Sequence, residues 1–233
     1  MTTLPKRLAL FDLDHTLLPV DSDVLWAQQL VELGVVDPSW HSRRNDHFYE
    51  QYKQGCLDID EFLAFQLGPL AQHPVDQLHA WRADFLEQKI RPQIRPAASA
   101  LVEQHRQQGD LLALVTATND FVTAPIAHAF GIEHLIATKV ERGEDGRYTG
   151  RHVGLPSFQA GKVTRVRQWL AGLDADLDSF EQTFFYSDSR NDLPLLARVT
   201  HPVAVNPDPT LRAHALAQGW PVLELFPQEP SAT

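Results

Sequence analysis

The sequence predicts an α/β protein with a doubly wound, mainly parallel sheet and an all-helical segment inserted after the first strand. Two observations indicate the sheet: short apolar runs recur along the chain, and amphipathic helical patterns separate them. Strands and helices that alternate in this way form parallel sheets with helices on both faces. The third observation indicates the insertion, because residues 18–95 contain helical patterns only.

The composition is that of a globular protein without a nucleic-acid or membrane partner. The chain has 233 residues, 43% apolar and 21% charged, which suffices for one large or two modest domains. The net charge is −10, and the sequence has no cluster of Lys or Arg that could bind nucleic acid or anionic lipid by charge alone. No run reaches the ~18 apolar residues that a membrane span needs. A single cysteine, Cys56, and a short start before Leu8 without a signal peptide predict a cytoplasmic protein.

Short apolar runs are the expected strands of the sheet. They cover residues 7–13, 110–117, 134–140, 183–187, 202–205 and 221–225. The helical patterns between them cover residues 97–108, 120–130, 161–170, 193–199 and 211–218. Several of these helices are followed by glycine, where we expect the left-handed backbone that ends many helices. These glycines are Gly109, Gly131, Gly172 and Gly219.

The helical stretch interrupts the alternation and predicts a cap domain at residues 18–95. The α/β core then consists of residues 1–17 and 96–233. Ser22 can cap the first helix of the insertion, which ends before Gly34.

Further helices of the cap are marked by capping residues and apolar faces. Asp58 followed by Glu61 approximates a capping box, and Pro74 precedes a helix with apolar residues along one side. With the segment around Phe48 and Tyr52, these patterns predict a small helical bundle with its own core.

Two remaining segments have simpler interpretations. Residues 140–153 carry the turn sequence Glu144-Asp-Gly-Arg147 between two strand-like arms, which predicts a β-hairpin. The tail from Pro227 to Thr233 is expected to be frayed.

Two carboxylates directly follow the first apolar run. Asp12 and Asp14 stand two residues apart where the strand ends, the edge at which doubly wound folds build their sites. Such a pair can bind one divalent cation, while one carboxylate attacks phosphorus and the other transfers protons. Alternatively, Asp-x-Asp is only a helix cap or a turn.

A second strand ends in hydroxyl residues, in the sequence Leu114-Val-Thr116-Ala-Thr118-Asn119. The hydroxyl of this segment and the free N–H groups of the following helix can bind a phosphoryl oxygen. Capping of that helix by Thr118 or Asn119 is the alternative, and both functions can hold together.

Lys162 stands at the start of an amphipathic helix. A cation is less favourable near a helix N-terminus than near a C-terminus, which indicates a partner anion. The usual alternative is a solvated surface charge.

Further acids follow an aromatic strand in the sequence Phe184-Phe-Tyr-Ser-Asp188-Ser-Arg-Asn191-Asp192. Asp188 can complete a cation site, and Asp192 can begin a helix and orient Lys162. N-capping before Leu193 is the alternative, and it fits Asp192 better than Asp188.

These four motifs, each after the expected kind of element and in this order, resemble the haloacid dehalogenase-like hydrolase superfamily. The resemblance covers essentially the whole chain, and the inserted helices resemble the cap of its phosphoserine phosphatase-like branch. It implies a Rossmann-like core, Mg²⁺ as cofactor, and hydrolysis of a small phosphorylated metabolite through an aspartyl-phosphate.

The resemblance also implies a role for each motif residue. Asp12 would be the nucleophile and Asp14 the general acid and base. The magnesium would be held by the Asp12 carboxylate, the Asp14 backbone carbonyl, Asp188 and waters, an oxygen shell that Mg²⁺ prefers. Asp192 would support the lysine and the metal shell.

The phosphoryl group would be contacted by Thr116 and neutralised by Lys162. Other residues expected to bind the substrate are Ala117, Thr118, Asn119 and Asn191. Two positions depart from the commonest family pattern, because His15 replaces a small residue and Ser187 replaces a glycine. Neither change removes a catalytic atom, and we interpret His15 as a loop residue.

The cap should select the substrate. Phosphoserine phosphatases carry a glutamate for the substrate amine and a cap arginine for its carboxylate; here Asp21, with Asp23 nearby, matches the first, and the arginine is missing from the corresponding stretch. This favours a cationic phosphate without a carboxylate, such as histidinol phosphate. Helix capping is the alternative for Asp21 and Asp23.

Other functions remain open on the same residues. Arg43 or Arg44 could replace the missing arginine, which would restore phosphoserine as substrate. A phosphotransferase or mutase would use the same scaffold with a different acceptor. A phosphoacceptor signalling domain also uses acids, a hydroxyl and a lysine, but the large insertion and the leading Asp-x-Asp count against it.

Overall fold

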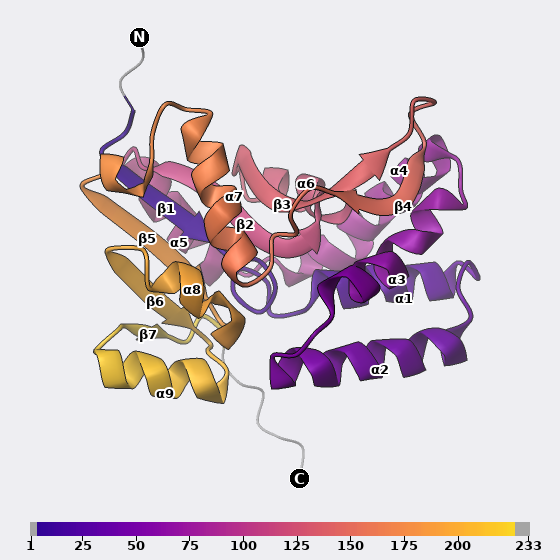
Figure 1. Cartoon of the computed structure of the whole chain (residues 1–233), viewed down its shortest axis with the longest axis horizontal. Helices are drawn as coiled ribbons and strands as arrows, with labels where there is room; N and C mark the ends of the chain where they lie inside the picture. Colours follow the sequence, from indigo (N-terminus) through magenta and orange to yellow (C-terminus); the bar gives the residue numbers. More distant parts are fainter. Residues whose placement is uncertain (1–3, 227–233) are drawn as a thin grey trace.

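A central sheet with helices on both faces organises the protein (Figure 1). The computed structural model describes residues 4–226. Within this range the sheet has the strand order β4-β3-β2-β1-β5-β6-β7. Its strands are β1 (Arg7–Phe11), β2 (Leu111–Asn119), β3 (His134–Arg142), β4 (Tyr148–Val153), β5 (Gln182–Ser187), β6 (His201–Val205) and β7 (Val222–Leu223). All neighbours pair in parallel except β3 and β4, so the predicted fold class is confirmed.

The two faces of the sheet bury alternate residues of β1. Ala9 and Phe11 point into one apolar cluster, and Leu8 and Leu10 into the other. The first cluster includes residues of α5 (Pro96–Gln107) and α6 (Asp120–Ala129). The second includes residues of α7 (Ala160–Ala171), α8 (Leu193–Leu196) and α9 (Pro209–Gln218). Helices therefore cover both faces, and the fold is doubly wound.

The helix ends follow the glycine pattern with one exception. Gly109, Gly131 and Gly219 have φ of +73°, +66° and +69°, the left-handed conformation that was predicted. Gly172 does not, because its φ is −67°. Asp174, two residues later, takes φ +55° instead, so the chain reverses after the helix and not at its last residue.

The sequence predicted that the inserted helices form a bundle with a core of their own. In the structure they do not. They are α1 (Ser22–Glu32), α2 (Pro38–Gln54), α3 (Ile59–Ala71) and α4 (Val75–Phe85), followed by a π-helical turn (Leu86–Ile90) and a 3-10 turn (Arg91–Gln93). Trp26 of α1 packs edge-on against Phe85 of α4 and Phe121 of α6, with ring centroids 5.3 Å and 5.6 Å apart. Buried residues of α1, α3 and α4 thus join the same apolar cluster as one face of the sheet.

Two capping predictions are wrong in detail. Asp21, not Ser22, caps α1, because its carboxylate accepts a hydrogen bond from the Val24 N–H at 2.9 Å. Asp58 caps α3, but Glu61 pairs with Arg44 of α2 at 2.8 Å and does not complete a capping box.

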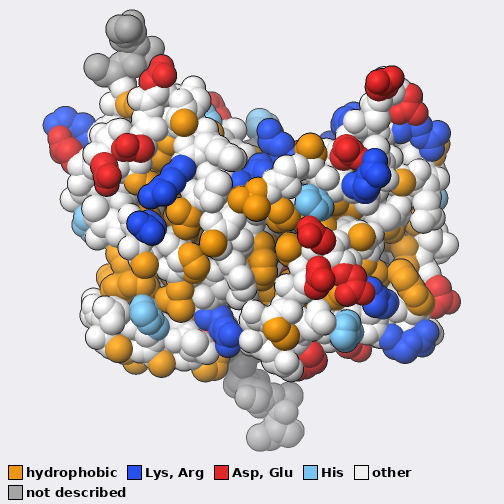
Figure 2. Space-filling model, viewed as in Figure 1, with side chains coloured by type: hydrophobic (Ala, Val, Ile, Leu, Met, Phe, Trp, Pro, Cys, Tyr) orange, Lys and Arg blue, Asp and Glu red, His pale blue; other side chains and the backbone are white. Residues whose placement is uncertain are grey.

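The predicted hairpin forms between β3 and β4 and packs against α3. Gly150 allows this approach: it has φ +78°, and a β-carbon there would meet Ala71 at 3.2 Å. Pro227–Thr233 lies outside the described residues. On the face shown in Figure 2, Lys and Arg side chains are dispersed among acidic ones. Of the helices between residues 4 and 226, none is long and apolar enough to cross a membrane.

Candidate active site

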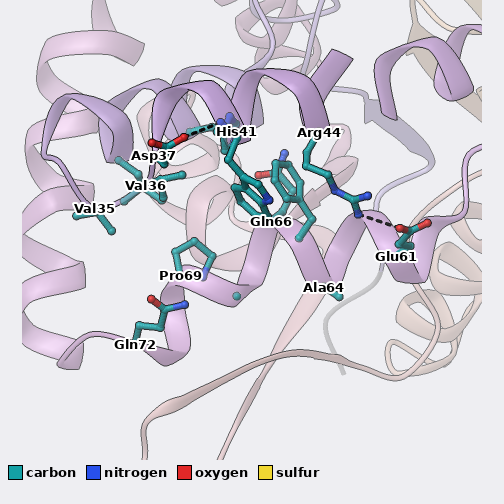
Figure 3. A pocket seen from close by; sticks show the side chains of 15 residues that line it. Val35, Val36, Asp37, His41, Arg44, Glu61, Ala64, Gln66, Pro69 and Gln72 are labelled. Atoms are coloured by element: carbon teal, nitrogen blue, oxygen red, sulfur yellow. Dashed lines mark hydrogen bonds and ion pairs between the residues drawn. The ribbon is translucent and has the colours of Figure 1, made fainter. Parts of the chain in front are cut away.

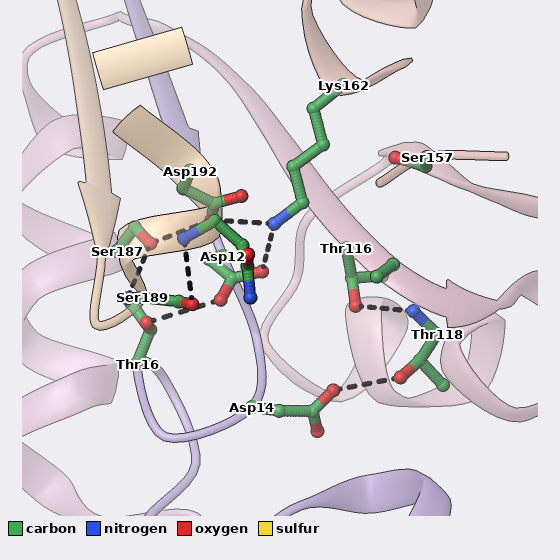
Figure 4. Close-up of polar contacts among 12 residues, drawn as sticks. Asp12, Asp14, Thr16, Thr116, Thr118, Ser157, Lys162, Ser187, Ser189 and Asp192 are labelled. Carbon is green, nitrogen blue, oxygen red and sulfur yellow. Dashed lines mark hydrogen bonds and ion pairs between the residues drawn. The ribbon is translucent and has the colours of Figure 1, made fainter. Parts of the chain in front are cut away.

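A cavity of about 460 Å³ opens at the carboxyl ends of β1, β2 and β5. Five side chains that the sequence predicted from four separate motifs line it. They are Asp12, Asp14, Thr116, Lys162 and Asp188, and the close-up in Figure 4 shows most of their polar contacts. Parallel strands bring the carboxylates and Thr116 together because the carboxyl ends of these strands share one edge of the sheet, and Lys162 reaches them from α7.

Asp12 is held at the end of β1 by the neighbouring strand and by a lysine. Its backbone N–H donates to the Tyr186 carbonyl at 2.9 Å, which continues the pairing of β1 with β5. Its Oδ1 accepts a hydrogen bond from Lys162 Nζ at 2.8 Å. Burial raises the pKa of Asp12, although the charge of Lys162 opposes this shift.

Lys162 reaches Asp12 from the first turn of α7. It is 3% exposed, so it is not the solvated surface charge of the alternative interpretation. Its Nζ also donates to Asp192 Oδ2 at 2.7 Å. Burial alone would lower the pKa of Lys162, but the charges of Asp12 and Asp192 outweigh it and raise the pKa. The lysine is therefore a permanent cation in the cavity.

Asp192 is part of this ion pair and does not cap a helix. No side-chain capping bond is formed at α8, and Asp192 Oδ2 instead also accepts from the Ser187 hydroxyl at 2.7 Å. Burial raises the pKa of Asp192 to about 6, against the opposing charge of Lys162. Ser187, which stands where the family usually has glycine, thus supplies an extra hydrogen bond to the cluster.

Thr16 lies between two carboxylates, a contact that the sequence analysis missed. Its Oγ1 is 3.2 Å from Asp188 Oδ1 and 3.5 Å from Asp12 Oδ2. Burial and the nearby charges of Asp12 and Asp192 raise the pKa of Asp188 well above its usual range. The position of Thr16, two residues after Asp14, was the available signal.

The residues of this cluster fit a divalent cation. Asp12 and Asp192 are buried and bond Lys162, and half-buried Asp188 lies close enough to feel their charges. Three carboxylates beside one lysine leave an excess of negative charge in a site where unpaired charge is costly. An ion between Asp12 and Asp188 would remove that excess, and an oxygen-only donor set suits Mg²⁺. Among residues 4–226, no three His, Cys, Asp or Glu side chains are placed to hold a metal by themselves. Backbone carbonyl oxygens and water would have to complete the shell.

Asp14 is fixed at both carboxyl oxygens. Its Oδ1 accepts from the Ser22 N–H at 2.7 Å, and its Oδ2 from the Thr118 hydroxyl at 2.9 Å. Burial, together with the charge of Asp21, raises the pKa of Asp14 to about 6. His15 follows with φ +58°, an unusual conformation for a side chain with a β-carbon, so the structure places it in a tight loop as expected.

The end of β2 combines capping with a polar lining. Asn119 caps α6 by accepting from the Val122 N–H at 3.1 Å, so the cap is Asn119 and not Thr118. The Thr118 N–H donates to the Thr116 hydroxyl at 3.2 Å. Ala117, Thr116 and Thr118 all line the cavity, whereas Asn119, which the sequence predicted to bind the substrate, is not part of the lining.

The remaining predicted substrate residues also border the cavity. Asp21 and Asp23 come from the start of α1, and Asn191 from the short 3-10 helix Arg190–Asp192 after β5. Asn191 Oδ1 accepts from Gln159 at 3.1 Å, while its buried Nδ2 has no hydrogen-bond partner among the described residues. That amide donor is therefore available to a bound group.

The inserted helices supply an aromatic wall that the sequence analysis did not assign to the site. Phe48, Tyr52 and Phe62 line the cavity. The Tyr52 hydroxyl donates to Ser189 Oγ at 2.9 Å, which fastens α2 to the loop after β5. Hydropathy marked these residues as apolar helix positions, and no local signal distinguishes a cavity wall from a core.

Arg43 and Arg44 do not line this cavity. Arg44 borders a second cavity, of about 570 Å³ between α1, α2 and α3, where it pairs with Glu61 (Figure 3). Gln66 lines both cavities. The interpretation in which either arginine replaces the missing cap arginine is therefore not supported by their positions.

A doubly wound sheet carries buried carboxylates and a buried lysine at its carboxyl edge, an arrangement typical of α/β proteins that act on phosphoryl groups. The chain belongs to the haloacid dehalogenase-like hydrolase family, whose model matches residues 9–197. The predicted family is thereby confirmed, and the relatives described next also support the predicted phosphatase class.

Several relatives match over almost the whole chain. A histidinol-phosphatase of Neisseria meningitidis is 48% identical over 218 residues, which cover 94% of this chain and 98% of that protein. A crystal structure of a protein with unknown function from Bordetella pertussis has a TM-score of 0.90 at 54% identity, and covers 96% of this chain and 100% of that one. A structure of a substrate-bound phosphoserine phosphatase matches with a TM-score of 0.66 at 18% identity, and the match covers 95% of this chain and 94% of that one. At this identity it shows a likeness of fold alone.

Proposed function

We propose that the protein is a magnesium-dependent phosphomonoesterase that works through an aspartyl-phosphate on Asp12, with histidinol phosphate as its substrate. The observation that carries this proposal is the Asp12 carboxylate, held 2.8 Å from buried Lys162 in the cavity that Asp14 also lines. A nucleophile, a fixed cation and a proton-transferring carboxyl group then face one space.

The reaction follows from these positions in two steps. An Asp12 oxygen attacks phosphorus, the bond from phosphorus to the ester oxygen breaks, and Asp14 gives its proton to that oxygen so that the alcohol leaves. Water then attacks the same phosphorus and gives a proton to Asp14, and the bond to Asp12 breaks to release inorganic phosphate. Lys162 stabilises the charge on the phosphoryl oxygens throughout, and the N–H groups around Thr118 and the Thr116 hydroxyl contact them.

The residues that would hold Mg²⁺ are the Asp12 and Asp188 carboxylates and the Asp14 backbone carbonyl, with Asp192 supporting the site through Lys162. When bound, the ion neutralises charge on the phosphoryl group. The positive charge of the ion would add to that of Lys162. Both charges are needed to hold an anionic phosphate, because the protein as a whole is acidic.

The two sides of the cavity support an amino-alcohol phosphate with an aromatic ring. Asp21 and Asp23 border one side, where the Asp21 carboxylate suits an ammonium group, and the aromatic wall from α2 and α3 suits an imidazole ring. Two cations, Lys53 and Arg190, also border the cavity, but they are engaged by Glu50 and by the Gln54 carbonyl. The histidinol-phosphatase that is 48% identical to this chain supports the same substrate.

The experiment is a comparison of phosphate esters with the purified protein in Mg²⁺. We expect kcat/KM to be highest for histidinol phosphate and lower for phosphoserine and p-nitrophenyl phosphate, with release of inorganic phosphate. Asp12→Asn should lower turnover to below about one thousandth of wild type on every ester. Exposed Asp178→Asn is the matched control and should leave turnover unchanged.

Three results would contradict the proposal. Wild-type turnover by Asp12→Asn would show that Asp12 is not the nucleophile. A clear preference for phosphoserine would show that histidinol phosphate is not the substrate. Transfer of the phosphoryl group to a second alcohol, without release of phosphate, would make the protein a phosphotransferase.

A further inference from the structure

The Thr118 hydroxyl lies between two carboxyl groups from different parts of the chain. Its oxygen is 2.9 Å from Asp14 Oδ2 and 3.1 Å from Asp23 Oδ2, both within hydrogen-bond range. Thr118 stands near the end of β2, Asp14 follows β1, and Asp23 belongs to the first turn of α1. Figure 4 shows the link from Thr118 to Asp14. One hydroxyl therefore joins the edge of the sheet to the inserted helices.

The first turn of α1 reaches Asp14 by two routes. The Ser22 N–H donates directly to Asp14 Oδ1 at 2.7 Å. The next residue, Asp23, reaches Asp14 Oδ2 only through Thr118. Together the two routes fix the plane of the Asp14 carboxyl group, which a single hydrogen bond would leave free to rotate.

Asp23 is committed to contacts within the protein. Its Oδ2 meets Thr118, its Oδ1 accepts from Asn119 Nδ2 at 3.3 Å, and the residue is 6% exposed. Burial, with the nearby charges of Asp21 and Asp14, raises the pKa of Asp23 well above its usual range. A protonated Asp23 carboxyl group can donate to the Thr118 hydroxyl oxygen while the Thr118 hydroxyl donates to Asp14. The Asp23 proton and the Thr118 proton then have one acceptor each.

We propose that Asp23 is a positioning residue that acts through Thr118 to hold the Asp14 carboxyl toward the leaving oxygen of the substrate. This inference rests on the proposed function, in which Asp14 protonates that oxygen. Asp21 differs from Asp23: its Oδ1 caps α1, and its Oδ2 has no hydrogen-bond partner within residues 4–226. Of the two acids, Asp21 is thus the one free to meet a substrate ammonium group directly.

The test uses kcat/KM, which reports the steps up to departure of the alcohol and excludes the later hydrolysis of the aspartyl-phosphate. Three esters are compared. The first is histidinol phosphate, and the second is 3-(imidazol-4-yl)propyl phosphate, which is the same molecule without the amine. The third is p-nitrophenyl phosphate, whose leaving group needs little protonation. The variants are Asp23→Ala and Thr118→Val, with Thr118→Ser as the conservative change and Asp21→Asn as the matched acid control.

We expect Asp23→Ala and Thr118→Val to lower kcat/KM for both alkyl phosphates by about 10-fold or more, because misplaced general acids lose part of a 10²- to 10⁴-fold effect. For p-nitrophenyl phosphate the loss should stay within about 2-fold, since proton transfer contributes little there. Thr118→Ser should retain nearly wild-type values. Asp21→Asn should lower kcat/KM for histidinol phosphate more than for the analogue without the amine, because only histidinol phosphate offers Asp21 an ammonium group. If Asp23→Ala does not fold, Thr118→Val provides the same comparison.

Two patterns would overturn the inference. A loss confined to histidinol phosphate would make Asp23 a contact for the substrate amine, and an equal loss or no loss on all three esters would make its role structural. A wild-type protein that hydrolyses none of the esters would be a different failure. It would overturn the proposed function, and this inference with it.

Discussion

Replacing Gly161 by alanine should reduce both stability and catalysis, because this glycine lets the chain pass close to itself just before Lys162. A β-carbon at Gly161 would stand well inside van der Waals contact with the Pro156 carbonyl oxygen, a backbone atom that no rotamer change can move. The Gly161 N–H also donates to the Phe158 carbonyl at 2.8 Å, so the loop is tied on both sides. The start of α7 must therefore shift as a unit.

The size of the effect follows from that contact. Restoring ordinary separation requires roughly 1 Å of backbone movement, and overpacking of this kind costs about 1–3 kcal/mol of unfolding free energy. Lys162 is the next residue and holds Asp12 at 2.8 Å, so the same movement displaces the ammonium group. A misplacement of about 1 Å can lower turnover by about 10²-fold.

The assay pairs urea unfolding with steady-state hydrolysis of p-nitrophenyl phosphate. Gly68→Ala is the control, because a β-carbon there meets nothing within 4 Å and the residue lies inside α3. That variant should be as stable as wild type or more stable by about 0.5–1 kcal/mol, with unchanged turnover. If Gly161→Ala retained wild-type stability and activity, the close approach to Pro156 would not position Lys162.

Further outcomes follow from other contacts. Tyr52→Phe should lower the unfolding free energy by about 1 kcal/mol and raise KM, because it removes the 2.9 Å bond to Ser189; unchanged KM would show that this bond does not hold the cavity wall. His105 bonds Asp110 at 2.6 Å and Tyr186 at 2.7 Å, and burial lowers its pKa below the ordinary 6.5. The neutral ring is thus favoured in the folded state, so stability is full above pH 6.5 and falls below it; His105→Gln should flatten this fall in urea unfolding at pH 5 and pH 8. Mg²⁺ should raise the melting temperature and EDTA should abolish turnover, because the ion neutralises buried carboxylates; an unchanged melting temperature would contradict the metal site.

The fold and the placement of the motif residues could be predicted because they depend on local patterns. Apolar runs followed by Asp12, Thr116 and Asp188 place polar residues at strand ends, and parallel strands bring those ends to one edge whatever the details of packing. Family membership followed from the same order of motifs. The catalytic roles of these residues stay predictions until variants are measured.

Other features could not be predicted, because they depend on distances between segments that are remote in the sequence. The position of Thr16 between Asp12 and Asp188 requires β1 and β5 to be neighbours at a fixed register. Whether a helix-start acid such as Asp23 caps its helix or bonds Thr118 depends on how α1 lies against the end of β2.

The sequence by itself determined the class of fold, the order of strands and helices along the chain, and which carboxylates and which lysine meet. The fold class and the order of elements follow from hydropathy period and strand ends, which are set within a few residues. The meeting of Lys162 with the carboxylates was implied by the resemblance of the four motifs to the family. Tertiary structure decided that the inserted helices share the core of the sheet, and that Tyr52 lines the cavity and bonds Ser189. It also fixed both oxygens of Asp14. Such contacts depend on side-chain packing between distant segments, and no local pattern encodes them.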